Sequence, residues 1–224
     1  MNMRLLAGLL FAVSVVGFSL GATLPLVSLR LHEAGAGTLE IGVISAIPAA
    51  GMMLSAFLVD ACCRHLSRRN LYLLCFSLCT ASIALLEPAF GSLWMLALLR
   101  LGLGLGMGIA IILGESWVNE LCPDHNRGKI MALYATSFTG FQVLGPAMLA
   151  VLGAGSPWIT GVVTACYGLA LLCILFTVPN DYVAHEKGDK SFGLAGFFRV
   201  APALCVAVLF FSFFDAVVLS LLSS

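Results

Sequence analysis

Residues 94–128 read WMLALLRLGLGLGMGIAIILGESWVNELCPDHNRG, and this stretch decides which kind of fold the chain adopts. In water it would make a poor helix, because each interior glycine lowers the stability of the helix by about 1 kcal/mol relative to alanine. In a bilayer the backbone must form its hydrogen bonds within the segment, and small residues let neighbouring helices approach closely. The stretch therefore predicts a membrane-spanning helix that packs tightly on its neighbours.

Two charged residues, Arg100 and Glu115, lie inside this predicted span. Charges within a membrane span are costly and mark a functional site by default. On a helix they are separated by about 60° of rotation and roughly 22 Å of rise, too far for a direct ion pair. Gly104 and Gly108 lie on the Arg100 side, whereas Gly106 points to the opposite side. We therefore expect one face to line a cavity and the other to pack on a neighbouring helix.

The composition excludes a soluble protein. Hydrophobic residues make up 61% of the chain and charged residues 10%, whereas soluble domains have about 25% charged residues. The lipid bilayer is therefore the expected environment. No basic patch or soluble domain is large enough to bind nucleic acid. The cysteines form no C-x-x-C pair and the histidines share no ligand spacing, so neither a metal nor a cofactor is predicted.

Apolar runs long enough to cross a bilayer recur along the chain. They predict seven spans, at residues 5–29, 39–59, 71–86, 93–118, 130–152, 158–178 and 201–222. The longest polar stretch separates the sixth span from the seventh. The chain is thus expected to be an all-α polytopic membrane protein, with a six-helix bundle over residues 1–178, a linker over 179–198 and a seventh helix within 199–224.

The basic residues predict the orientation, because positively charged loops stay in the cytoplasm. If the N-terminus is cytoplasmic, only Arg30 lies on the outer side. The cytoplasmic side then holds Arg4, Arg64, Arg68, Arg69, Arg127, Lys129, Lys187, Lys190 and Arg199. This asymmetry predicts a cytoplasmic N-terminus and a cytoplasmic linker.

This organisation resembles the first half of a major facilitator superfamily (MFS) transporter. An arginine followed by glycines, as at Arg100, is similar to the fourth helix of that family, and Gly145-Pro146 is similar to a motif of its fifth helix. Asp60 and the basic residues from Arg64 onward match the loop after the second helix, although glycines usual there are replaced.

The order of Glu115-Ser116-Trp117 and Asn126-Arg127-Gly128 most resembles the YcaD-like branch, which groups presumed effluxers and sugar-permease relatives. Full-length family members have about twelve spans. The resemblance therefore implies an N-terminal half plus the seventh helix, with a missing C-terminal bundle as partner. It also implies a small-molecule substrate and a multi-pass location in the cell membrane, most naturally a bacterial inner membrane.

The candidate site residues fall into two groups. Those expected on a substrate or proton pathway are Arg100, Glu115, Gln142 and Asp215. Those expected in helix packing and gating are Asp60, Arg64, Gly104, Gly106, Gly108, Gly145 and Pro146. Other interpretations stay open: a structural ion pair or a snorkelling side chain for Arg100, a water-facing position for Glu115, and interhelical bonding for Gln142.

The leading functional hypothesis is a secondary active transporter that moves a small solute by alternating access. Proton coupling is compatible with it, because neutralising a buried carboxylate removes its desolvation penalty. The alternative is a non-transporting truncated membrane protein, an assembly partner or a sensor built on the same half-fold. A membrane enzyme is not expected, because no nucleophile–base pair, metal-ligand cluster or phosphate loop is visible.

Overall fold

The computed structural model describes residues 3–153, 155–178, 206 and 210. The chain divides into two compact units, residues 1–183 and 184–224, and the helices from Met3 to Thr177 belong to the first. Of the predicted seventh span only residues 206 and 210 are described, and Asp215 lies outside the described residues.

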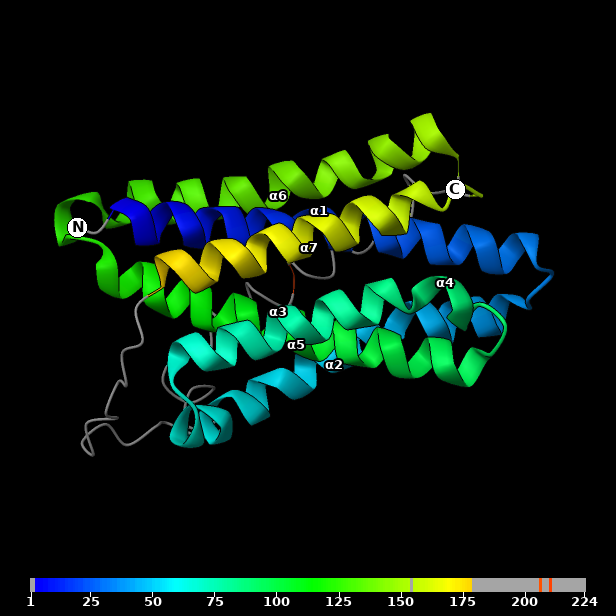
Figure 1. Cartoon of the computed structure of the whole chain (residues 1–224), viewed down its shortest axis with the longest axis horizontal. Helices are drawn as coiled ribbons and strands as arrows, with labels where there is room; N and C mark the ends of the chain where they lie inside the picture. The colour runs from blue at the N-terminus through cyan, green and yellow to red at the C-terminus, as the bar shows by residue number, and fades with distance from the viewer. Residues whose placement is uncertain (1–2, 154, 179–205, 207–209, 211–224) are drawn as a thin grey trace. The chain divides into compact units, whose positions relative to one another are not determined.

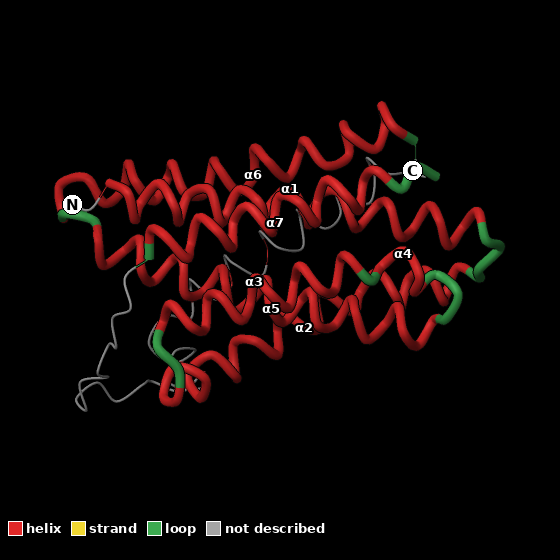
Figure 2. Tube along the Cα trace, in the orientation of Figure 1, coloured by secondary structure: helices red, strands yellow, loops and turns green. Residues whose placement is uncertain are grey.

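The described part of the first unit is helical, with short connections (Figure 2). Its long helices are α1 (Met3–Glu33), α2 (Thr38–His65), α3 (Arg68–Ala84), α5 (Leu93–Leu121), α6 (Arg127–Leu152) and α7 (Trp158–Thr177). The short elements are α4 (Leu86–Ala89) and the 3-10 turn η1 (Asp124–Asn126). Five segments among the described residues are long and apolar enough to cross a membrane: α1, α2, α5, α6 with η1, and α7. The predicted all-α polytopic membrane fold is confirmed.

The helices extend beyond the predicted apolar spans. Asp60 and Arg64, expected in a connection, lie in the last turns of α2, and only Leu66 and Ser67 separate α2 from α3. The prediction of a loop at Asp60 is therefore wrong. The physical reason is that polar side chains at the membrane surface can reach water while the backbone continues its helical hydrogen bonds.

The six long helices pack in two groups of three (Figure 1). In one group α1 contacts both α6 and α7, and in the other α5 contacts both α2 and α3. The α3–α7 contact is the largest between the two groups. Successive long helices alternate in direction, so their connections gather at two ends. The "Arg30 end" carries the α1–α2, α3–α5 and α6–α7 connections, and the "Arg68 end" carries the α2–α3 and α5–α6 connections.

Glycines allow close approach on both sides of α5. Gly104 and Gly108 face α2, where an added Cβ would meet Pro48 and Ser55. On the other side, a Cβ at Gly106 would lie 2.6 Å from Cys79 Sγ and 2.9 Å from the backbone oxygen of Cys75 on α3. Both faces of this helix therefore pack on neighbouring helices around these glycines, and the cavity expected along one face stays a prediction.

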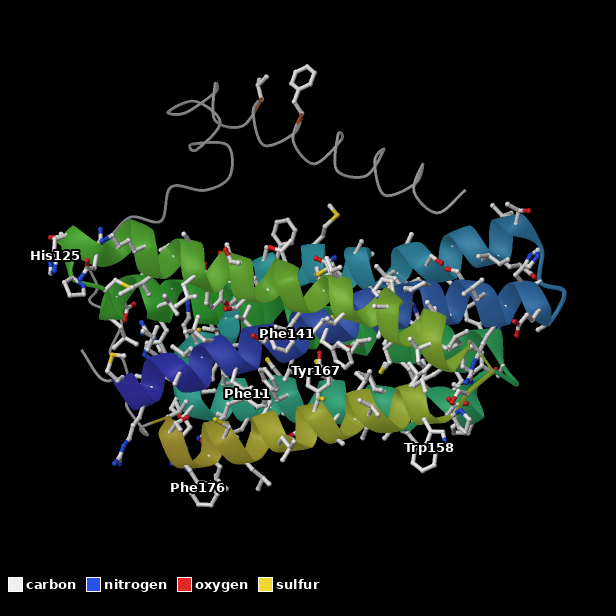
Figure 3. The ribbon with its side chains drawn as sticks, turned by 90° about the horizontal axis from the view of Figure 1, so that it is seen from above. Phe11, His125, Phe141, Trp158, Tyr167 and Phe176 are labelled. Atoms are coloured by element: carbon white, nitrogen blue, oxygen red, sulfur yellow. The ribbon has the colours of Figure 1, made fainter. Side chains whose placement is uncertain are left out.

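Aromatic side chains fill the region between α3, α5 and α7. Phe76 stacks on Tyr72 with ring centroids 5.5 Å apart and lies 5.5 Å from Tyr167 of α7. Tyr167 is fully buried. Trp158 and Phe176, near the two ends of the same helix, are 72% and 83% exposed and point away from the bundle (Figure 3). This arrangement suits a helix with one face in the core and one face in lipid.

Candidate functional site

Arg100 is the most deeply buried charged residue among those described. Its relative exposure is 0%. Its Nε donates to the Ile44 backbone oxygen of α2 at 3.2 Å, and its Nη1 donates to the Thr23 backbone oxygen of α1 at 3.1 Å. One guanidinium thus joins three helices. Sequence analysis singled out Arg100 but missed these two acceptors, because backbone carbonyls carry no sequence signature.

The Arg100 guanidinium has no carboxylate partner within the described part of the chain. Its Nη2 is buried there without a hydrogen-bond partner. A buried charge without a counter-ion is costly unless hydrogen bonds compensate it. Among these residues, Arg100 is therefore held by backbone oxygens of α1 and α2 and not by the structural ion pair considered from the sequence.

Glu115 lies on an exposed part of α5, one residue beyond the buried Gly114. It forms no ion pair among the described residues, and in particular none with Arg100. The remaining pathway candidate described here, Gln142 of α6, is half-buried, and its backbone oxygen lies against Gly21 of α1.

The packing candidates divide between the interior and the surface. Gly145 is buried, and an added Cβ would collide with the backbone of α1 at Gly21 and Ala22. Pro146 is exposed on the same helix. At the Arg68 end, Asp60 and Arg64 are also exposed. Among the residues described, Gly145 thus marks the α1–α6 contact, whereas Pro146, Asp60 and Arg64 lie on the surface of this unit.

A cluster that we call the Arg68 clasp joins α3 to α5 and α7. Arg68 donates two hydrogen bonds to the Glu120 carboxylate, at 2.5 and 2.7 Å, and its guanidinium lies 5.8 Å from the Trp117 ring centre. Arg69 donates to the backbone oxygen of Leu175 at 2.8 Å. The sequence indicated only a basic loop here. Glu120 could have been found because α3 begins, and α5 ends, at the same end of the bundle.

A second cluster, the Arg30 clasp, lies at the opposite end. Arg30 pairs with the Glu87 carboxylate and donates to the Ser156 backbone oxygen at 3.1 Å. The Thr160 hydroxyl donates to Glu87 at 2.7 Å, and the Arg30 guanidinium lies 5.0 Å from the Phe90 ring centre. These contacts join α1, α4 and α7. Sequence analysis missed the pair, although alternating spans bring both residues to one end.

The Glu87 carboxylate responds to two opposing influences. Burial raises its pKa, but the hydrogen bonds from Arg30 and Thr160 and the Arg30 charge outweigh burial, so the pKa lies below its usual value. The folded protein then binds fewer protons than the unfolded chain as pH falls through this range. The clasp therefore stabilises the fold fully at neutral pH and loses that contribution below about pH 4.

Replacing Glu87 with glutamine should remove most of this contribution. We expect Glu87→Gln to lower the stability of the purified protein by about 1 kcal/mol at pH 7, since the pair is partly exposed. The variant should also show a weaker loss of stability between pH 5 and pH 3, measured by thermal unfolding in detergent. Glu33→Gln, which changes an exposed carboxylate at the same end of α1 as Arg30, is the matched control. Equal acid sensitivity in wild type and Glu87→Gln would contradict the assignment.

Other features of the described residues carry no chemistry of a reaction site. No group of three His, Cys, Asp or Glu residues is placed there to hold a metal ion. An open hollow of about 440 Å³ lies between the end of α3 and the start of α7. Its lining is small or apolar apart from two threonines: Ile83, Ala84, Pro157, Thr160, Gly161, Thr164 and Ala165. Neither Arg100 nor Glu115 reaches it.

Comparison with known proteins gives two matches. Residues 9–224 match the family model of the Major Facilitator Superfamily. The chain is 28% identical over 193 residues to the "Uncharacterized MFS-type transporter YfkF" of Bacillus subtilis (strain 168), a match that covers 82% of this chain and 48% of that protein. The chain thus spans about half the length of this relative. With its apolar helices, it is a multi-pass membrane protein that belongs to the major facilitator superfamily.

Proposed function

We propose that this chain forms the first half of a secondary active transporter that moves a small solute by alternating access. The observation that carries the proposal is Arg100, a fully buried guanidinium at the junction of α1, α2 and α5, one nitrogen of which has no partner among the described residues. Family membership supports a transporter over an enzyme. The closer resemblance to the YcaD-like branch and a bacterial inner membrane are parts of the same proposal.

The two clasps support the movement of this bundle as one body. The Arg30 clasp joins α1, α4 and α7 at one end, and the Arg68 clasp joins α3, α5 and α7 at the other. Alternating access in such folds is largely rigid-body rocking of one bundle against another. By the charge asymmetry of the loops, we assign the Arg68 end to the cytoplasm and the Arg30 end to the outside.

The uneven burial of the helices supports a proposal for the position of the second bundle. Within this chain only 11% of the α6 span and 22% of the α2 span are buried, against 78% of the α1 span. We assign the exposed faces of α2 and α6 to contact with a C-terminal bundle, beyond the usual lipid contact. Asp215, predicted mid-way along the seventh span, would then contribute to the pathway from that second half.

The proposed pathway uses both charged residues of α5. Arg100 would lie towards the outside and Glu115 towards the cytoplasm, with Gln142 of α6 as a neutral hydrogen-bonding group. Protonation of Glu115 would remove its charge and change which conformation is favoured, since a ligand shifts an equilibrium only through its different affinity for two states. This is the route by which a proton gradient would drive the solute.

Flux through the reconstituted full-length protein tests the proposal. Proteoliposomes containing the complete gene product are loaded with a panel of sugars, amines and organic acids, and an inside-acidic or inside-alkaline pH gradient is imposed. We expect at least one solute to accumulate against its gradient and to be released when a protonophore collapses the pH difference. If no solute responds to any imposed gradient, the chain instead serves the non-transporting role of an assembly partner or sensor.

A further inference from the structure

The open hollow between the end of α3 and the start of α7 interrupts an exposed stripe on α7. The residues of this stripe recur at intervals of three or four, so they share one face of the helix. They are Trp158, Gly161, Ala165, Leu169, Leu172 and Phe176, and all are exposed. Trp158 and Phe176, at the two ends of the stripe, point away from the bundle (Figure 3). The stripe is the surface that α7 offers to the membrane around this unit.

Two small residues make the interruption. Gly161 and Ala165 line the hollow, and neither carries more than a methyl group. Within the described part of the chain, a Cβ built at Gly161 meets nothing within 4 Å. This glycine differs from Gly104 and Gly106 of α5, where an added Cβ would collide with a neighbouring helix. Helix packing among the described residues therefore does not require a glycine at position 161, and the space beside it is open to an occupant.

The polar groups around the hollow are already used inside the protein. The Thr160 hydroxyl donates to the Glu87 carboxylate at 2.7 Å, and the Thr164 hydroxyl donates to the Thr160 backbone oxygen at 2.7 Å. Glu87 in turn pairs with Arg30. The remaining lining residues are apolar or glycine: Ile83, Ala84, Pro157, Gly161 and Ala165. The hollow therefore offers its occupant apolar contact rather than a charge.

The depth of the hollow matches the acyl-chain region of a bilayer. Along the helix axis, Gly161 and Ala165 lie about 4.5 Å and about 10 Å from Trp158. Tryptophan is enriched at membrane interfaces, and Trp158 is 72% exposed. The rise from Trp158 to Phe176 is about 27 Å, close to the thickness of about 30 Å of the hydrocarbon core. The hollow thus lies just below the interface, in the leaflet at the Arg30 end.

We propose that the hollow binds an acyl chain of a phospholipid from this leaflet. The protein is a multi-pass membrane protein, so the bilayer supplies such chains at the exposed apolar surface of α7. The volume of about 440 Å³ lies within the range of about 300–1,000 Å³ that is usual for small-molecule sites. A bound chain supplies the van der Waals contacts that the lining of an empty space would lose.

A second copy of the chain is the main rival occupant. Gly161 and Ala165 are four residues apart, a spacing at which small residues let two membrane helices approach closely. A partner helix would also have to pass Trp158 and Leu169, which flank the hollow on the same stripe and are 72% and 57% exposed. These large side chains keep a straight helix at a distance. A narrow, flexible acyl chain can enter between them.

A bound acyl chain would extend the contact between the two groups of three helices. The α3–α7 contact joins these groups, and the hollow lies at its Arg30 end. Farther along the same contact, Phe76 of α3 lies against Tyr167 of α7 with ring centroids 5.5 Å apart. Near the hollow, small residues take the place of such rings. We therefore expect phospholipid to stabilise the folded protein through this site.

Native mass spectrometry of the full-length protein tests the proposal, with palmitoyl-oleoyl phosphatidylglycerol titrated into the detergent-purified sample. Gly161→Phe places a ring at the hollow without a backbone collision. We expect it to weaken binding of the tightest phospholipid at least about tenfold, because the chain loses its contacts with the lining. It should also reduce the rise in unfolding temperature that the lipid gives to the wild type.

Gly168→Phe is the matched control. Within the described part of the chain its Cβ also meets nothing within 4 Å, and it lies two turns farther along α7, away from the residues that line the hollow. We expect this variant to bind lipid as the wild type does. Unchanged lipid binding in Gly161→Phe, or an equal loss in Gly168→Phe, would overturn the proposal.

Two further readouts of the same experiment separate the rival explanations. Phosphatidylethanolamine with the same acyl chains should bind with comparable affinity, because the charges of Arg30 and Glu87 beside the hollow are paired with each other. Strong selection between the two headgroups would show that the headgroup is recognised, and would overturn the acyl-chain site. A dimeric wild type that Gly161→Phe converts to a monomer would assign the hollow to a second copy instead. None of these readouts depends on solute flux.

Discussion

Replacing Gly145 with valine should prevent the six-helix bundle from assembling in its native form. A Cβ at this position collides with backbone atoms of Gly21 and Ala22 on α1, which cannot move aside as a side chain would. The α1–α6 pair makes the most extensive helix contact in the described structure. Overpacking of this kind costs about 1–3 kcal/mol even where side chains can adjust, so a backbone collision should exceed about 3 kcal/mol. The expected result is a large fall in the monodisperse fraction after detergent extraction.

Gly140→Val is the matched control, because it makes the same substitution on the same helix. Nothing lies within 4 Å of a Cβ built at Gly140. We expect this variant to elute and unfold as the wild type does. Gly145→Val behaving like Gly140→Val would show that α1 and α6 do not approach each other as described.

Replacing Arg100 with alanine should abolish solute flux while the helices still insert. An arginine at the centre of a span disfavours insertion by about 2.5–3.5 kcal/mol, so alanine cannot make insertion worse. The variant loses the two hydrogen bonds that the charged guanidinium donates to the backbone oxygens of Thr23 on α1 and Ile44 on α2. Each such bond contributes about 1.5–3 kcal/mol, and 1.36 kcal/mol corresponds to a tenfold change in rate. We therefore expect flux to fall on the order of 100-fold.

Arg100→Lys separates the charge from the geometry. Lysine keeps the positive charge, but its single ammonium lacks the planar fork with which Arg100 reaches the carbonyls of Thr23 and Ile44 on two helices. We expect flux between those of the wild type and Arg100→Ala. Full activity in Arg100→Lys would show that the charge alone matters, and the bridge between α1 and α2 would then have no role.

Much of the fold could be predicted because the spans are long and apolar. The glycine-rich run from Arg100 to Gly108 indicated close helix packing, and the structure places Gly104 and Gly106 against different neighbours. The helix ends were harder to predict, since apolar periodicity stops at the membrane surface whereas the helix does not. This is why Asp60 and Arg64 belong to α2 rather than to a loop.

The site could be predicted less completely, because its partners come from distant parts of the chain. A single charged residue such as Arg100 is conspicuous in an apolar run. Its acceptors on α1 and α2 are backbone oxygens, which are the same in every sequence. Tyr134 and Tyr72 carry no signal in the sequence, and only the packing around Gly114 brings their hydroxyls together.

Gradient-driven flux of wild type and Arg100→Ala, compared in proteoliposomes at equal protein density, tests the central claim most directly. Both proteins are the full-length gene product, and their unfolding transitions are recorded beforehand to show that both are folded. We predict that the wild type accumulates solute and that flux in Arg100→Ala falls on the order of 100-fold. Equal flux in the two proteins would contradict the assignment of Arg100 to the transport pathway.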